Sequence, residues 1–376
     1  MLARGAALAA AVLLLCLCRG AGGASHWSTF AVPSCRQGRL LFTQEAARSR
    51  DHHSAVYDGR RARFLEHFLD HLVEEFGGHN DAFTPTLDGL RAAAPEWPGP
   101  NITFIDVGAG LYGAEADKAH AAEVLRRWGC GLGTVVVALE PNDAARLQAR
   151  RAVRAALRAS MGRRAAEECQ GRIAWYGAAA SDKNGSRAQL RGKDNGASIS
   201  PTVPEKTRAP QYNHWSGEVE TITVDAIAKR HGLHHVDILK VDAEGHDFAV
   251  LQGARGLLES GHVTLVVWEL GANLNSLYYA NWVEKTPTAL PRGGLRALQP
   301  PHLLSVMRWL DERAYDCFFL GTKVLVPLTG VWWDDAYDVC VRSEGLPCWY
   351  DVLCVHRGAR RPLAAVWSLA TLLAQL

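Results

Sequence analysis

The chain has 376 residues, of which 48% are hydrophobic and 21% are charged, so it is long enough to bury a large core. Its formal net charge is +2, and two of its 41 basic residues, Arg4 and Arg19, lie in the first 25 residues, which contain no acid. The remaining basic residues therefore equal the 39 acidic ones. A neutral chain gives no electrostatic reason to expect a nucleic-acid partner.

The N-terminus has the pattern of a secretory signal, with Arg4 ahead of an apolar run over 6–17 and small residues at 21–24. We predict a signal peptide over 1–24 and a location in the secretory pathway, either secreted or in the lumen of the endoplasmic reticulum or Golgi. The run is short for a membrane span, so no integral span is expected after cleavage. An uncleaved anchor is the alternative.

Cysteine usage also fits an oxidising compartment, because seven cysteines follow the predicted signal and four of them lie in the last sixty residues. This predicts a disulfide-linked C-terminal region whose connectivity stays open. No Cys-x-x-Cys pair occurs, so no metal site is expected. Two sequons, Asn101-Ile-Thr103 and Asn184-Gly-Ser186, predict a glycoprotein, and the second lies in a polar turn.

Along the chain, residues 25–100 are expected to form an N-terminal region of helix and loop, with a helix over 62–76. Strands and helices then alternate, which is typical of a parallel sheet with helices on both faces. Residues 186–218 are polar, and we predict a flexible cover over the site. The predicted strands are 102–107, 134–140, 172–179, 236–242 and 263–269, and the predicted helices lie near 114–129, 142–160 and 247–259.

The first predicted strand is followed by Gly108, Gly110 and Gly113, which fit the G-x-G-x-x-G pattern. Such a loop lets a ligand approach the backbone, and it serves dinucleotides and S-adenosylmethionine alike. Asp106 lies on that strand, and Glu140 ends the next one, where a carboxylate can accept both ribose hydroxyls. Glu140 lies further along the chain than the roughly 20-residue offset of the dinucleotide fingerprint.

The segment 236–246 is the most informative part of the sequence, because its apolar strand ends in Asp242 and Glu244, followed by Gly245 and His246. Carboxylates are costly to bury without partners, and open α/β sheets place ligands at the carboxyl ends of their strands. These residues therefore predict a site. Lys240, on the strand, is expected to pair with a carboxylate.

Taken together, these segments resemble the FkbM-type methyltransferase family over about residues 100–270. The resemblance rests on Phe104-Ile-Asp-Val-Gly-Ala-Gly110, Leu139-Glu-Pro141, Gly177 to Gly185, Asn195-Gly-Ala-Ser198, Thr221 to Asp225, and Ile238 to Gly245 with Val250 to Ala254. It implies a Rossmann-like methyltransferase fold, mostly parallel with an antiparallel last strand, and S-adenosylmethionine as cofactor. The implied reaction is O-methylation of a hydroxyl on a glycan or small molecule.

The resemblance also implies roles for individual residues at the strand ends. One of the residues after the 236–242 strand would be the general base, and the earlier residues would bind the methionine part, the ribose and the adenine. The implied cofactor-binding residues are Asp106, Gly108, Ala109, Gly110, Glu140, Pro141, Ser181 and Asp182, and the implied catalytic residues are Asp242, Glu244 and His246.

The predicted methyltransferase core spans 101–270, and the region 271–361 is expected to complete the sheet through Tyr315 to Leu320 and Tyr350 to His356. The pair Trp332-Trp333 there suits either a sugar-binding face or a small aromatic core. The apolar tail 362–376 is too short for a span and suits an amphipathic helix. Two other functions stay open: an NAD(P)-dependent oxidoreductase using the same glycine loop, and a non-catalytic carbohydrate-binding protein with a methyltransferase-like shell.

One helix of the predicted core carries a basic face, because Arg150, Arg154 and Arg158 follow Pro141 at helical spacing. Such a run of arginines is usually only a solvated helix face. The more specific alternative is a surface that binds an acidic partner.

Overall fold

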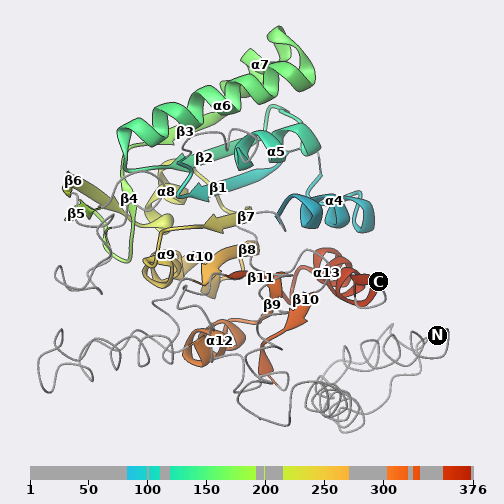
Figure 1. The fold of residues 1–376 in the computed structure, drawn as a ribbon. Helices are drawn as coiled ribbons and strands as arrows, with labels where there is room; N and C mark the ends of the chain where they lie inside the picture. The colour runs from blue at the N-terminus through green and yellow to red at the C-terminus, as the bar shows by residue number, and fades with distance from the viewer. Residues whose placement is uncertain are drawn as a thin grey trace, which may run out of the picture.

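The protein is described by a computed structural model that covers residues 83–99, 101–110, 119–191, 199, 215–270, 303–320, 325–330 and 350–373. Its centre is an eight-stranded sheet with the order β10-β9-β11-β8-β7-β1-β2-β3 (Figure 1). Helices cover both faces of the sheet, as the sequence predicted.

Five neighbouring strands are parallel: β1 (Thr103–Val107), β2 (Val135–Leu139), β3 (Ile173–Tyr176), β7 (Val236–Val241) and β8 (Val263–Leu270). Residues of β7 and β8 are buried at every position, because helices cover both faces of these strands. A strand in this position needs a nearly continuous apolar sequence. The chain leaves β1 toward β2 and β3 and later returns to the other side of β1 as β7. This reversal brings the carboxyl ends of β1 and β7 side by side, at the position where such folds bind ligands.

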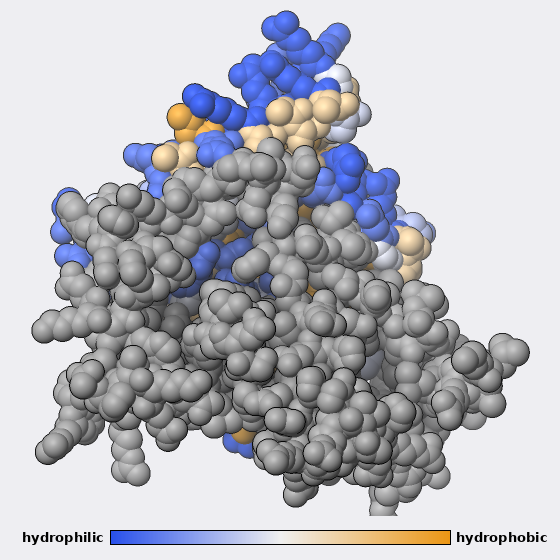
Figure 2. All heavy atoms as spheres, in the orientation of Figure 1, coloured by the Kyte–Doolittle hydropathy of each residue, from blue (hydrophilic) through white to orange (hydrophobic). Residues whose placement is uncertain are grey.

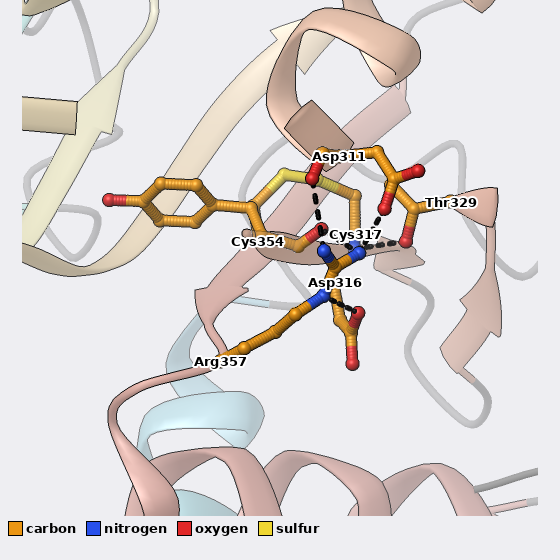
Figure 3. The surroundings of a disulfide bond; sticks show 7 residues. Asp311, Asp316, Cys317, Thr329, Cys354 and Arg357 are labelled. Atoms are coloured by element: carbon orange, nitrogen blue, oxygen red, sulfur yellow. Dashed lines mark hydrogen bonds and ion pairs between the residues drawn. A yellow bond between two sulfur atoms is a disulfide. The ribbon is translucent and has the colours of Figure 1, made fainter. Parts of the chain in front are cut away.

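The C-terminal region completes the sheet with antiparallel strands, which confirms the prediction for that region. Strand β11 (Tyr350–His356) is antiparallel to β8 and to β9 (Tyr315–Leu320), and β10 (Leu325–Pro327) forms the edge. Facing residues of β9 and β11, Cys317 and Cys354, form a disulfide. Beside it, Arg357 pairs with Asp316 and Asp311 (Figure 3).

Two apolar cores, one on each face, hold the helices to the sheet. One face packs against α8 (Val224–Arg230), α9 (Asp247–Gly253), α10 (Arg255–Glu259) and α12 (Leu303–Glu312). The other packs against α4 (Phe83–Ala93), α5 (His120–Trp128), α6 (Asp143–Met161), α7 (Arg163–Gln170) and α13 (Arg360–Leu373). Three alanines, Val153 and Leu157 form the buried face of α6, and the small alanines let that helix lie close to the sheet.

Several predicted boundaries shift in the structure. The helix predicted over 247–259 is two helices that meet at Ala254, and the strand predicted over 172–179 is β3 followed by β4 (Ala179–Ala180). The described part of the helix predicted near 114–129 is α5. The helix predicted over 62–76 lies outside the described residues.

The prediction of a flexible cover over 186–218 is wrong at both ends of that segment, where the structure has strands. Strands β5 (Arg187–Arg191) and β6 (Trp215–Ile222) pair antiparallel, and β4 joins β6 to make a three-stranded sheet. Buried Leu190 and Ile222 anchor these strands, so a mostly polar segment still forms regular structure. The residues between the two strands fall almost entirely outside the described part of the chain.

The apolar tail begins as α13, which contributes Ala365 and Val366 to a core. Within the described ranges, no helix combines the length and the hydropathy that crossing a membrane requires. A second disulfide, Cys130–Cys169, joins the residues after α5 to α7. This disulfide is not in the C-terminal region, where the sequence led us to expect disulfides. Three other cysteines, Cys35, Cys340 and Cys348, lie outside the described residues.

Candidate active site

The glycine loop after β1 is packed directly against the end of β7. The backbone N–H groups of Gly108 and Ala109 both donate to the carbonyl of Leu139, each at 3.0 Å. Gly108 has φ +76°, and a Cβ atom there would lie 1.7 Å from the carbonyl oxygen of Asp242. Only glycine combines this backbone conformation with this close approach. This packing places the glycine loop, the part of the sequence that predicts cofactor binding, beside the carboxylates that follow β7.

The second glycine of the loop lies against the carboxylate of Glu140. A Cβ atom on Gly110 would meet Oε2 of Glu140 at 2.3 Å, and Oε1 accepts a hydrogen bond of 2.7 Å from the N–H of Asn142. Burial raises the pKa of the Glu140 carboxyl to about 7, although the N–H groups of Asn142 and Gly110 lower it. Pro141 then leads into α6, whose first N–H groups are capped by the Asn142 side chain.

Asp106 provides a buried acceptor in the same place. Its side chain is 2% exposed, and its Oδ1 atom has no hydrogen-bond partner among the described residues. Nδ1 of His120 lies 3.8 Å from this oxygen, beyond hydrogen-bond distance. Asp106, Ala109, Gly110, His120 and Trp175 line a small hollow. A buried carboxylate oxygen beside a hollow suits a ligand that brings an ammonium group or another donor.

Lys240 and Asp242, at the end of β7, form an ion pair, as the sequence predicted for Lys240. The ammonium nitrogen lies 3.0 Å from Oδ2 of Asp242, and the lysine side chain is 1% exposed. Burial alone would raise the pKa of Asp242, but the Lys240 ammonium outweighs it and lowers that pKa. Asp106 is the register partner of Lys240 on β1, so the same ammonium also faces the cofactor-type loop.

Glu244 lies in the turn between β7 and α9 and has an unusual backbone. Its φ is +51°, a backbone angle that residues other than glycine, asparagine and aspartate seldom adopt. Burial raises the pKa of the Glu244 carboxyl well above its ordinary value, and the neighbouring Asp242 and Asp247 add to that rise. Backbone strain of this kind is concentrated at functional sites.

Asp247 shapes this turn, and the sequence reasoning missed it. The side chain is completely buried, and it accepts hydrogen bonds from the N–H groups of Ala243 at 2.8 Å and Gly245 at 3.0 Å. Burial raises the pKa of Asp247 to about 7, while those N–H groups lower it. The available signal was an aspartate at the start of a helix, where acids commonly bind free backbone N–H groups.

His246 connects the same turn to the end of β4. Its Nε2 atom lies 2.9 Å from Oγ of Ser181, and that hydroxyl donates to Oδ1 of Asp182 at 3.0 Å. Because the hydroxyl hydrogen is used toward Asp182, Nε2 of His246 acts as the donor. Burial lowers the pKa of His246, although the negative charge of Asp182 acts in the opposite direction. Two predicted cofactor-binding residues and a predicted catalytic residue thus form one chain of hydrogen bonds.

Two further buried acidic residues, which the sequence reasoning did not single out, lie on the strands beyond β7. Glu269 is the penultimate residue of β8, and Asp351 is its register partner on β11. Burial raises the pKa of Glu269 well above its usual value and that of Asp351 to about 6. An acid ending the strand over 263–269 was visible in the sequence, but its neighbour on β11 was not. Within the described ranges, no group of three acidic, histidine or cysteine side chains is arranged to hold a metal ion.

The structure therefore brings the predicted residues to one edge of the sheet. The loop after β1 and the end of β2 form one half of the candidate site. The turn after β7 forms the other half, and the two halves meet where Gly108 contacts Asp242. Ser181 and Asp182 join the second half through His246. The third glycine, Gly113, lies outside the described residues.

Comparison with known proteins assigns this arrangement to a family. The family model of the methyltransferase FkbM domain matches residues 106–317, which is more than half of the chain and spans the strand ends described above. No curated protein and no solved structure matches the chain. FkbM methyltransferases use S-adenosylmethionine, and the buried Asp106 oxygen, the glycine approach and Glu140 fit that cofactor. The chain belongs to the FkbM methyltransferase family and is an S-adenosylmethionine-dependent methyltransferase rather than an oxidoreductase.

Proposed function

We propose that this methyltransferase acts on a hydroxyl oxygen of a glycan or small-molecule acceptor in the secretory pathway. The observation that carries the proposal is the contact between Gly108 and Asp242, which sets the cofactor-type loop beside a carboxylate-rich turn. A hydroxyl must lose its proton as it is methylated, and a carboxylate beside the methyl group can accept that proton.

On the cofactor side, each proposed residue has a matching group. Asp106 would accept the ammonium group of the methionine part beside the backbone of Gly108, Ala109 and Gly110. Glu140 would accept the ribose hydroxyls, with Pro141 fixing the turn that follows. Ser181 and Asp182 would lie at the adenine. The bound cofactor supplies a methyl group that is already activated, so the protein's main tasks are alignment and proton removal.

On the acceptor side, we assign the general base to Glu244. Its side chain is half-buried in the turn after β7, and burial raises the pKa of its carboxyl, which makes the carboxylate a stronger proton acceptor. Asp242 is held by Lys240, which makes it a weaker base and a better acceptor for orienting the hydroxyl. His246 fixes the turn through Ser181. The proton of the acceptor hydroxyl would pass to Glu244 as the oxygen–carbon bond forms.

The compartment is supported by two disulfides, Cys130–Cys169 and Cys317–Cys354, because such bonds persist in oxidising environments. Asn184 is exposed in the turn between β4 and β5, where a glycan can be attached. Asn101 is also exposed, but its side chain accepts a hydrogen bond from the N–H of Gly133. The predicted signal peptide over 1–24 lies outside the described residues.

The test of the function begins with calorimetric titration of the glycosylated protein with S-adenosylhomocysteine and NAD, followed by methyl transfer to an array of glycans and hydroxyl-bearing small molecules. We expect binding of the first ligand only. On a verified acceptor, Glu244→Gln should lower kcat by about 10²–10⁴-fold, the usual contribution of a positioned base, with unchanged cofactor affinity.

The matched control is Glu168→Gln, which makes the same change at an exposed carboxylate of α7. Full activity of Glu244→Gln would move the base to another residue. A product methylated on nitrogen or carbon would contradict the proposed reaction.

A further inference from the structure

The outward face of α6 carries a row of arginines that the proposed reaction does not use. Arg146, Arg150, Arg154 and Arg158 recur every four residues, and Arg151 lies beside them. At 1.5 Å per residue the row is about 18 Å long. Ala149 and Val153 of this helix are buried against the sheet, whereas Arg150, Arg151 and Arg154 are exposed and face away from it.

Most of the positive charge in this row is not neutralised. Arg150, Arg151 and Arg154 are exposed, and none of them forms an ion pair with a residue that the structure describes. Arg158 shares the single carboxylate of Glu167 with Arg163. Figure 2 shows hydrophilic side chains at the top of the molecule, where Figure 1 places α6 and α7. The chain as a whole is close to neutral, so this face is a local concentration of charge.

The row is also held on a fixed support. Helix α6 packs through five buried residues, and α7 is tied to the end of α5 by the Cys130–Cys169 disulfide. Arginines that are fixed in a row lose less freedom on binding than arginines on a mobile segment. Guanidinium groups bind sulfate, phosphate and carboxylate groups in a fork geometry. Anionic groups repeated along an extended polymer would therefore be complementary to this face.

We infer that Arg150, Arg151 and Arg154 on α6 form a docking surface for an acidic polysaccharide. The choice of a polysaccharide over a nucleic acid rests on the proposed secretory location, and the binding itself is independent of the methyl-transfer reaction. The row begins at Arg146, whose guanidinium donates to the carbonyl of Glu140 at 2.9 Å. A polymer on this surface would thus lie next to the site without occupying it.

The test compares binding of the complete glycosylated protein to dextran sulfate, to neutral dextran and to single-stranded DNA of matched length. The variant is Arg150→Gln, Arg151→Gln and Arg154→Gln together. The control is Arg187→Gln, Arg255→Gln and Arg361→Gln, which removes three exposed, ion-paired arginines elsewhere and changes the net charge equally. All substituted positions are on the surface, and melting temperatures should stay close to the parent value.

We expect the parent protein to bind dextran sulfate and not dextran. The α6 variant should bind at least about tenfold more weakly, with a salt dependence reduced by about two to three in log–log slope, as for the loss of three ionic contacts. The control should keep the parent affinity. Equal losses in both variants would show a general charge effect and overturn the inference, as would tighter, α6-dependent binding of the DNA.

Discussion

The hydroxyl of Ser181 and the imidazole of His246 are 65 residues apart in sequence and 2.9 Å apart in space. Their hydrogen bond joins the end of β4 to the turn after β7. If this bond positions the turn, then Ser181→Ala and His246→Ala should each lower kcat/KM, and the double variant should be little worse than either one. The expected coupling energy is about 0.5–3 kcal/mol for residues in direct contact.

A double-mutant cycle in steady-state kinetics measures this coupling. The pH profile adds an independent readout, because an acid limb that comes from the imidazole of His246 should disappear in His246→Ala and persist in Ser181→Ala. Strictly additive losses would mean that the two residues act separately.

Glu140 gives cofactor binding a defined pH dependence. Its pKa is about 7, raised by burial, and the ionised form is the one that accepts ribose hydroxyls best. Protonation below pH 7 should therefore weaken binding of S-adenosylhomocysteine, by about tenfold between pH 8 and pH 6 for a group with this pKa. Calorimetric titration across this range measures it. Glu140→Gln should bind more weakly and lose the pH dependence, and a slope that survives in that variant would point to another group.

Asp247 should matter for both stability and turnover. Asp247→Asn replaces one accepting oxygen with a donor, so a buried N–H of Ala243 or Gly245 loses its partner, at a cost of about 1–3 kcal/mol. The turn that carries Glu244 should then loosen, and kcat should fall. Chemical denaturation and kinetics measure the two effects.

Asp225 offers a control for this prediction, because its carboxylate on α8 also accepts two backbone N–H groups, those of Gly256 and Leu257, outside the turn after β7. Asp225→Asn should lower stability alone. Equal loss of turnover in the two variants would remove the special role of the turn.

Gly108 should tolerate no side chain. A left-handed backbone costs other residues about 1–2 kcal/mol, and Gly108→Ala adds an overlap with the carbonyl of Asp242. Gly129→Ala provides the comparison, since Gly129 has φ +81° with open space where its Cβ would lie. With ψ −174°, the backbone of Gly129 lies in a region that is essentially restricted to glycine, so we expect Gly129→Ala to lose about 1–3 kcal/mol and keep activity. Gly108→Ala should lose stability together with cofactor binding. Thermal melts with and without S-adenosylhomocysteine distinguish these outcomes.

The sequence alone determined the alternation of strands and helices, because the buried parallel strands are nearly continuous apolar runs and the helices between them carry apolar stripes. It also located the ends of β1, β2 and β7 as the candidate site, since polar residues and glycines directly follow those runs. Motifs of this kind are local in sequence, and a one-dimensional pattern is enough to recognise them.

Only the tertiary structure decided which of these residues touch. The pairing of His246 with Ser181, the approach of Gly108 to Asp242 and the register of Asp351 with Glu269 join segments that are far apart in the chain. Strands β5 and β6 likewise depend on pairing with each other more than on their own polar sequences. Such contacts follow from packing and register between distant segments, and no local pattern specifies them.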